Sequence, residues 1–182
     1  MATTSTKLTY EDFLLFPDDG RRHEIIDGEH YVNPSPNTKH QIVSARLFYG
    51  LYHHVEHHRL GIVFAAPYDV VLSNFDVVEP DLLFISNARR HIITDANVQG
   101  APDLLVEILS PSNRKYDEVV KFKRYDALGV GEYWIVDPEE ENVRVYRRDA
   151  GGLARVEIDD TITTPLLPDF VLRLRDLFVF VL

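Results

Sequence analysis

The sequence contains no cysteine, and this absence excludes several kinds of chemistry at once. Disulfides, thiolate zinc sites and cysteine nucleophiles cannot occur, and a chain without cysteine fits a reducing compartment. No apolar run approaches the roughly 20 residues that a membrane-spanning helix needs. Residues 1–7 lack the apolar core of a secretory signal, so we expect a disordered terminus on a cytoplasmic protein that has no membrane partner.

Several familiar site motifs are also missing. The chain has no glycine-rich phosphate loop ending in Lys-Ser/Thr, no dinucleotide fingerprint and no Gly-x-Ser-x-Gly elbow. Positive charge is scarce, since the formal net charge is −10. This charge argues against non-specific binding of a polyanion over the whole surface. A nucleic-acid partner would therefore need local basic clusters, or a metal ion that offsets nearby carboxylates.

What is present predicts one α/β domain over residues 1–182. The content of 45% hydrophobic and 26% charged residues is typical of a globular protein of this size. Hydrophobic periodicity and turn residues predict a central mixed β-sheet flanked by helices, with a C-terminal β-meander. The expected elements are a helix over residues 10–16, a hairpin turning at Asp27-Gly28, a helix over 37–59, strands over 61–72, 77–85 and 104–109, an irregular basic segment over 87–99, a helix over 115–128, and the meander over 133–158.

Acidic residues stand where strands should be buried. Glu107 lies inside an almost wholly apolar run, residues 104–109, and Asp81 heads another apolar strand, directly after Glu79-Pro80. An unpaired buried carboxylate costs several kcal/mol or takes up a proton, so each of these acids needs a partner. Two carboxylates from adjacent strands would form an all-oxygen site suited to Mg²⁺ or Mn²⁺. The alternative, that each acid is ion-paired with an arginine, stays open.

Lys121 lies on the helix that follows the Glu107 strand. Asp117, Lys121 and Tyr125 are spaced four residues apart and therefore share one helix face. A lysine in this place could return over the carboxylates, orient a metal-activated water and offset charge on a phosphate. On spacing alone, an exposed helix lysine is the better interpretation.

A series of strings in the chain resembles the signatures of the Uma2 family, in order from about Tyr10 to Tyr146. They are HEIIDGE at residues 23–29, PSP at 34–36 with His40, EPDLL at 79–83, PDLLVEILSPS at 102–112, Asp117-x-x-x-Lys121-x-x-x-Tyr125, and GVGEYWIVDP at 129–138. The resemblance implies a restriction-endonuclease-like fold of the PD-(D/E)xK nuclease superfamily. It also implies that Asp81 is the aspartate of the PD motif, that Glu107 is the second acid, and that Glu24 is the acid from the N-terminal element.

The lysine of that motif is displaced in this chain. The usual place, two residues after the second acid, holds Leu109. In this family the lysine has moved to the following helix, where Lys121 fits and Lys123 is the neighbouring candidate. Lys123 lies off the face shared by Asp117 and Tyr125.

Our working hypothesis is a metal-dependent endonuclease that hydrolyses DNA. Asp81 and Glu107 would hold Mg²⁺ or Mn²⁺ with the Ile108 carbonyl, Lys121 would position the attacking water, and Glu24 would tune the metal or the water. The alternative is a catalytically inactive module on the same fold that binds nucleic acid or a protein partner. The acid–acid–lysine set favours the enzyme, whereas the net charge of −10 favours the alternative.

Three further features of the sequence bear on partners. Histidines 53, 54, 57 and 58 form two i,i+4 pairs that could bind zinc, although a solvated helix end explains them better. Basic clusters at residues 89–91, 114–115 and 121–124 could flank the site and contact phosphate. The apolar tail, residues 177–182, predicts a homodimer or a segment that completes the monomer's own sheet.

Overall fold

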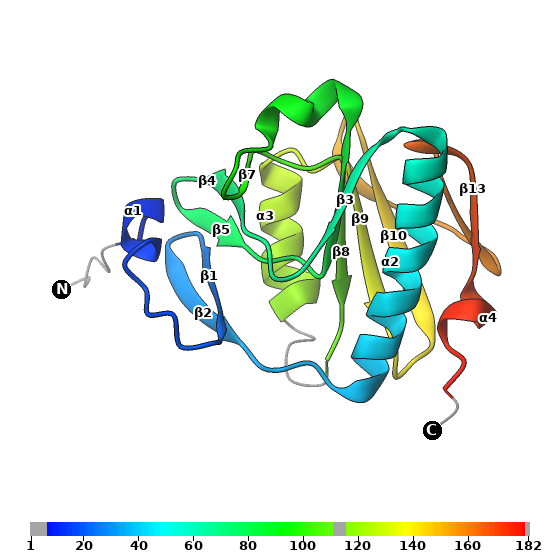
Figure 1. Cartoon of the computed structure of the whole chain (residues 1–182), viewed down its shortest axis with the longest axis horizontal. Helices are drawn as coiled ribbons and strands as arrows, with labels where there is room; N and C mark the ends of the chain where they lie inside the picture. The colour runs from blue at the N-terminus through cyan, green and yellow to red at the C-terminus, as the bar shows by residue number, and fades with distance from the viewer. Residues whose placement is uncertain (1–6, 111–115, 181–182) are drawn as a thin grey trace.

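The computed structural model describes residues 7–110 and 116–180. Two β-sheets make up most of it, and helices pack beside them (Figure 1). The larger sheet is mixed, because β8 and β9 run parallel while its other neighbouring strands are antiparallel. Its strands, in spatial order, are β11 (Gly152–Val156), β10 (Asn142–Asp149), β9 (Glu132–Asp137), β8 (Leu104–Ile108), β6 (Leu82–Ser86) and β3 (Gly61–Ala65). The expected central strand and C-terminal meander are therefore confirmed.

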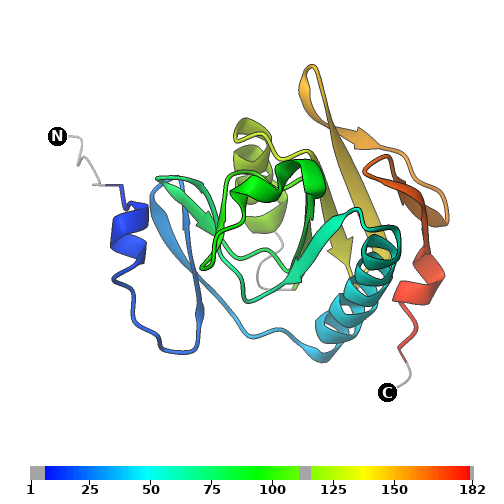
Figure 2. The same ribbon diagram turned by 45° about the horizontal axis from the view of Figure 1, so that its top comes forward.

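A second sheet of five strands lies at the N-terminal side of the first (Figures 1 and 2). Its strands, in spatial order, are β2 (Glu29–Asn33), β1 (Arg22–Ile26), β5 (Asp76–Val78), β4 (Val70–Ser73) and β7 (Val98–Gln99). The expected β1–β2 hairpin is confirmed, with Asp27 and Gly28 both at positive φ in its turn. Before it, α1 (Tyr10–Phe13) begins with the Thr9–Asp12 capping box and is shorter than expected.

The larger sheet is covered on both faces. On one face, α2 (Thr38–His58) buries Val43, Leu47, Leu51 and Val55 against alternate strand residues such as Phe84, Leu104 and Val106. On the other face, the intervening residues, including Leu83, Leu105 and Ile135, pack with Tyr125 of α3 (Phe122–Ala127) and with the second sheet. A strand that is buried on both faces has apolar residues at successive positions, and this explains the almost wholly apolar sequence of residues 104–109. Glu107 interrupts that run on the α3 side.

Two of the expected strands were wrong in extent. Residues 61–72 and 77–85 each form two strands that belong to different sheets. Pro67 separates β3 from β4 and Pro80 separates β5 from β6, because proline has no N–H to donate to a sheet ladder. Each chain segment therefore crosses from one sheet to the other, and Asp81 lies at the second crossing.

The helix expected over residues 115–128 is composite. The helix η2 (Tyr116–Lys121) has π-type hydrogen bonding and continues directly into α3. Gly129, at φ 86°, follows the end of α3, as predicted. Residues 111–115, which include the first residue of the expected helix and the whole basic cluster at 114–115, lie outside the described residues, as do residues 1–6 of the expected disordered terminus.

Between β6 and β7, η1 (Asn87–Ile92) is a 3₁₀ helix within the expected irregular segment. At the C-terminal end of the chain, the hairpin of β12 (Thr161–Thr164) and β13 (Leu167–Arg173) leads into α4 (Leu174–Leu177). Leu177 and Phe178 are buried against the core under α2, so this part of the apolar tail neither stays in water nor adds a strand. In the described part of the chain, no helix is both long and apolar enough to cross a bilayer.

Candidate active site

Asp81 is held at the point where the chain enters β6. Leu82 pairs with Val106 of β8, so Asp81 and Glu107 are the next residues along these two adjacent strands. The Asp81 carboxylate is almost fully buried, and its Oδ2 lies 2.8 Å from the Ile108 N–H and 3.1 Å from His40 Nε2. Its Oδ1 lies 3.1 Å from the Arg22 guanidinium. Burial alone would raise the pKa of Asp81, but His40, Arg22 and the Ile108 N–H together lower it, so the carboxylate is charged.

Two side chains of the helical segment that follows β8 donate hydrogen bonds to Glu107. Its Oε1 accepts hydrogen bonds from the Tyr125 hydroxyl at 2.7 Å and from Lys121 Nζ at 3.0 Å. Burial, together with the negative charges of Glu107 and Glu24, raises the pKa of Tyr125 well above its ordinary value. Tyr125 therefore keeps its proton and acts as a donor that fixes the orientation of Glu107.

Lys121 joins two acids in the interior. Its side chain is 1% exposed, and Nζ lies 3.0 Å from Glu24 Oε1 as well as 3.0 Å from Glu107. Glu24, on β1, also accepts the Glu79 N–H at 2.8 Å, while its Oε2 has no hydrogen-bond partner among residues 7–110 and 116–180. Lys123 is exposed. Of the two candidate lysines, Lys121 is therefore the one that contacts the acids.

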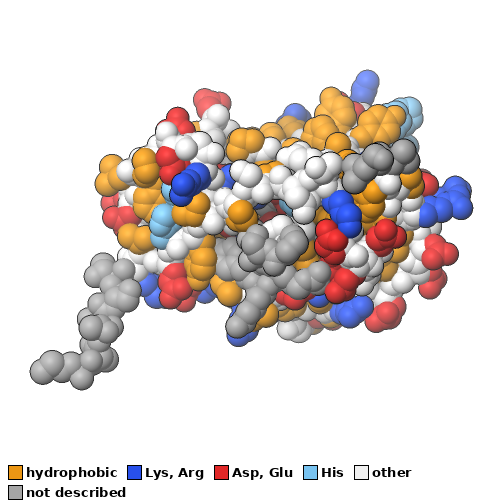
Figure 3. All heavy atoms as spheres, turned by 90° about the horizontal axis from the view of Figure 1, so that it is seen from below, with side chains coloured by type: hydrophobic (Ala, Val, Ile, Leu, Met, Phe, Trp, Pro, Cys, Tyr) orange, Lys and Arg blue, Asp and Glu red, His pale blue; other side chains and the backbone are white. Residues whose placement is uncertain are grey.

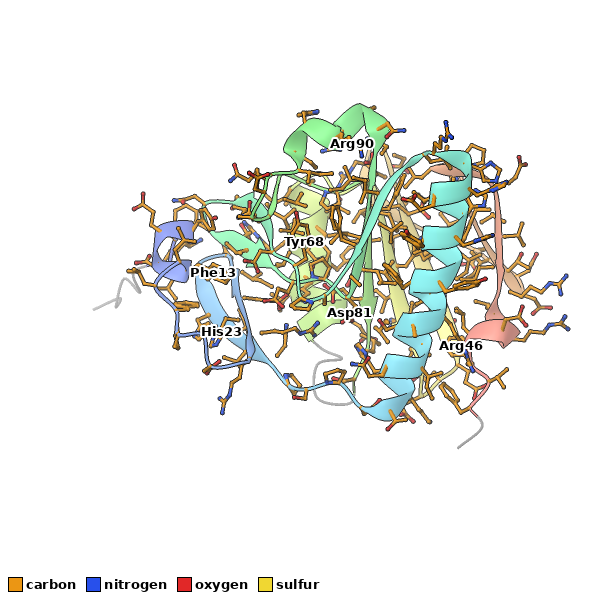
Figure 4. The ribbon with its side chains drawn as sticks, in the orientation of Figure 1. Phe13, His23, Arg46, Tyr68, Asp81 and Arg90 are labelled. Carbon is orange, nitrogen blue, oxygen red and sulfur yellow. The ribbon has the colours of Figure 1, made fainter. Side chains whose placement is uncertain are left out.

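Four of the five predicted site residues, all except Glu24, line a common hollow. Asp81, Glu107, Lys121 and Ile108 border a narrow pocket, together with Arg22 and His40. Arg22, His40 and Asp81 also line a wider cavity of about 490 Å³, which adjoins the narrow pocket. In Figure 4, Asp81 lies between α2 and α3, at the lower end of the larger sheet. The structure thus brings Asp81, Glu107, Lys121 and Glu24 together, whereas their catalytic roles remain predictions.

The donor set fits a hard cation, though only with backbone or solvent ligands added. Within the described parts of the chain, no group of three Asp, Glu, His or Cys side chains is arranged to hold a metal ion. Two carboxylates beside a pocket of about 10 Å³ match the oxygen ligands of Mg²⁺, which usually takes one or two carboxylates, and the waters that Mg²⁺ keeps would have to lie in the adjoining wider cavity. The Ile108 peptide, whose N–H already contacts Asp81, borders the same pocket.

Sequence reasoning missed three neighbours of these acids. Arg22 and His40 contact Asp81 directly, although His40 was known only as part of a family string. Glu79 faces the wider cavity, and burial, followed by the nearby Asp69 carboxylate, raises its pKa to about 7. The strongest available signal was local, because Arg22 and Glu79 are each two residues from a predicted site acid.

Among the described residues, the basic cluster at 89–91 does not flank the site, whereas Lys121 of the cluster at 121–124 lies within it. Arg90 lies on η1, at the end of the sheet opposite to Asp81 (Figure 4). Arg124 is committed to an ion pair with Asp76, at 2.5 Å, and Lys121 is buried. Residues 114 and 115 lie outside the described residues. Seen from below, acidic and basic side chains are interspersed over the surface (Figure 3).

The histidines at the end of α2 form no metal site with other side chains in the described ranges. The rings of His53 and His57 stack on the helix surface, and His54 Nε2 contacts the Pro168 carbonyl at 2.9 Å. Their arrangement supports the interpretation of a solvated helix end.

Comparison with known proteins identifies the family. The model of Uma2, described as "Putative restriction endonuclease", matches residues 10–175. An uncharacterized protein, slr1290 of Synechocystis sp., is 25% identical over 148 residues, which cover 80% of this chain and 77% of that protein. The fold matches a crystal structure from Anabaena variabilis, titled as a "putative nuclease belonging to DUF820", with a TM-score of 0.78, 22% identity and coverage of 94% of this chain and 97% of the other. The chain therefore belongs to the Uma2 family.

Proposed function

We propose that this protein is a metal-dependent endonuclease that hydrolyses DNA phosphodiester bonds. The observation that carries the proposal is the convergence of Asp81, Glu107 and Lys121 on one pocket that adjoins a larger cavity. Membership in a family described as "Putative restriction endonuclease", and a fold shared with a protein titled as a "putative nuclease", support the same activity. Fold alone would not establish chemistry, so the side-chain set is the stronger support.

The site residues have distinct roles in this proposal. Asp81 and Glu107, with the Ile108 carbonyl, would hold Mg²⁺ or Mn²⁺, which when bound supplies Lewis-acid activation of water and phosphate. Lys121, fixed between Glu107 and Glu24, would orient the attacking water and offset charge on the phosphate. His40 would orient Asp81, and Tyr125 would orient Glu107, through the hydrogen bonds they already make.

A cleavage assay with Glu107→Gln tests the proposal. The wild-type protein should cut supercoiled, linear or single-stranded DNA in the presence of Mg²⁺ or Mn²⁺ and stop when EDTA is added. The amide keeps the size of Glu107 but loses its charge, so we expect cleavage to fall at least about a hundredfold. Glu157→Gln, at an exposed position directly after β11, is the matched control and should cleave normally. Full activity in Glu107→Gln would place the chemistry elsewhere.

A second function has an observation in its favour. The net charge of −10 and the mixed surface charges favour a catalytically inactive module that binds nucleic acid or a protein partner. Persistent inactivity of the wild-type protein with every divalent cation and every DNA form would support this alternative.

We also propose that the protein acts as a homodimer, because paired sites are a direct means of cutting both strands of a duplex. The buried tail residues Leu177 and Phe178 no longer support this proposal. An apolar groove between α2 and α4, lined by Tyr49 and Leu172, offers one surface for self-association. Light scattering after gel filtration tests it, since a mass near the monomer's 21.0 kDa at micromolar concentration would exclude the dimer.

A further inference from the structure

The two oxygens of the Asp81 carboxylate differ in the number of polar groups that contact them. Oδ2 already receives the Ile108 N–H and lies against His40, so its lone pairs are used. Oδ1 contacts the Arg22 guanidinium at 3.1 Å. A cation that approaches Asp81 from the pocket must therefore bind through Oδ1, which is the oxygen that Arg22 holds. Arg22 and the cation compete for one atom.

Arg22 has donors to spare for another ligand. A guanidinium carries five N–H donors, and within the described residues the only hydrogen-bond partner of the Arg22 guanidinium is Asp81, although Glu107 and Glu24 also attract its charge. The side chain is 23% exposed and borders both the narrow pocket and the wider cavity, so its remaining donors can reach a ligand there. The planar guanidinium of arginine can donate two parallel hydrogen bonds to a phosphate, which the ammonium group of lysine cannot.

Asn33 provides a second donor beside Arg22. The two residues are direct partners in the register of the β1–β2 hairpin, so their side chains share one face of it. Asn33 is 7% exposed, yet its Nδ2 has no hydrogen-bond partner in residues 7–110 and 116–180. It lines the narrow pocket with Arg22, and both also line a neighbouring cavity of about 330 Å³. A buried donor left unpaired costs free energy until a ligand satisfies it.

From this geometry we infer that Arg22 and Asn33 form the phosphate-binding site of the enzyme, and that Arg22 transfers from Asp81 to a backbone phosphate of DNA when a divalent cation occupies Asp81 Oδ1. The inference rests on the proposed function. It assigns two states to one side chain. Arg22 neutralises Asp81 in this structure; a cation held by Asp81 would take over that neutralisation and leave the guanidinium able to bind the phosphodiester.

The test measures binding rather than turnover. Arg22→Gln removes the competitor at Asp81, so calorimetry should show Mn²⁺ binding about fivefold tighter than in the wild type. The same variant should bind DNA more weakly in Ca²⁺, and its plot of log K against log salt should lose about 0.9 of slope, the value for one phosphate contact. Arg90→Gln, at the opposite end of the sheet, makes the same charge change and should alter neither measurement.

Two further variants separate contact from folding. Asn33→Leu keeps roughly the size but removes the donor, so it should weaken DNA binding, while its melting temperature should not fall because the donor has no partner among the described residues of the free protein. Arg22→Lys keeps the charge and should keep the salt slope while losing part of the affinity. Arg22→Gln with unchanged or weaker Mn²⁺ binding, or with the salt slope of Arg90→Gln, would overturn the inference. Mn²⁺ binding and these shifts without any DNA cleavage would overturn only the proposed function, whereas a wild-type protein that binds no Mn²⁺ overturns both.

Discussion

Lys121 lies in an environment that its helix spacing alone does not specify. A helix lysine is ordinarily exposed, but this one lies between Glu24 and Glu107 in the interior. The helix spacing could not reveal this, because the two acids come from strands β1 and β8, and only the tertiary fold places them around the lysine. The ion pairs also answer the question of what partners the buried acid Glu107: a cationic side chain is already present, though it is a lysine and not an arginine.

Removing this buried charge should destabilise the protein. Lys121→Met leaves Glu24 and Glu107 without their buried counter-ion, so we expect the free energy of unfolding to fall by about 3–5 kcal/mol. Lys123→Met, two residues along on the exposed face, should change it by less than about 0.5 kcal/mol. Urea unfolding of both variants in EDTA measures the difference, and equal effects would show that Lys121 carries no structural ion pair.

Asp76 supplies a pH-dependent contribution to stability. It is fully buried, and its carboxylate accepts bonds from Arg124 at 2.8 and 2.5 Å, from Ser73 at 2.5 Å and from the Asp27 N–H at 2.9 Å. Burial would raise the pKa of Asp76, but Arg124, Ser73 and the Asp27 N–H outweigh it and lower the pKa below the ordinary value of 3.8. A lowered folded-state pKa stabilises the fold above the unfolded-state pKa, and that stability is lost as pH falls through the folded-state value.

Asp76→Asn should therefore be less stable than the wild type at pH 7, by about 2–4 kcal/mol. The difference should shrink as the pH falls below about 4, where the wild-type carboxylate becomes protonated. Thermal unfolding followed between pH 7 and pH 2.5 measures this, with Asp159→Asn at an exposed position as the control. A difference that stays constant with pH would show that the Asp76 charge does not stabilise the fold.

At the scale of elements, the sequence predicted strands, helices and turns better than it predicted sheets. The period of α2 and the apolar run of β8 are local signals, and both elements form as expected. The division of residues 61–72 and 77–85 between two sheets depends on which strands they meet, which hydrophobic alternation does not specify. Pro67 and Pro80 were the available signals for those breaks.

Two glycines should respond differently to alanine because their elements constrain them differently. At Gly61, the first residue of β3, an added Cβ would collide with the Ile85 carbonyl of β6, so Gly61→Ala should cost about 3 kcal/mol or more. At Gly129, after α3, no atom lies within 4 Å of an added Cβ among the described residues, and φ is 86°. Gly129→Ala should therefore cost only about 1 kcal/mol, from backbone strain. Chemical unfolding tests the order, and a larger loss at Gly129 would contradict it.

At the scale of the whole molecule, the site forms where the second sheet packs on the larger one, because its residues come from both sheets and from the helical segment that contains Lys121. The acids were predictable from the sequence because a carboxylate in an apolar strand is unusual, and the family strings assigned their roles. Arg22 was not predictable as a partner of Asp81, since the two residues are 59 positions apart and meet only where the second sheet packs on the first. The same reasoning explains Asn33, whose importance depends on the pocket beside it.

The central claim is that Asp81 and Glu107 together bind a divalent cation, and a crystal soaked in Mn²⁺ tests it most directly. We predict an anomalous difference peak in the pocket, within coordination distance of both carboxylates, with the Arg22 guanidinium moved away from Asp81 Oδ1. The peak should be absent from crystals of Glu107→Gln soaked in the same way. A wild-type crystal saturated with Mn²⁺ that shows no peak between Asp81 and Glu107, or shows one only at other residues, would contradict the account.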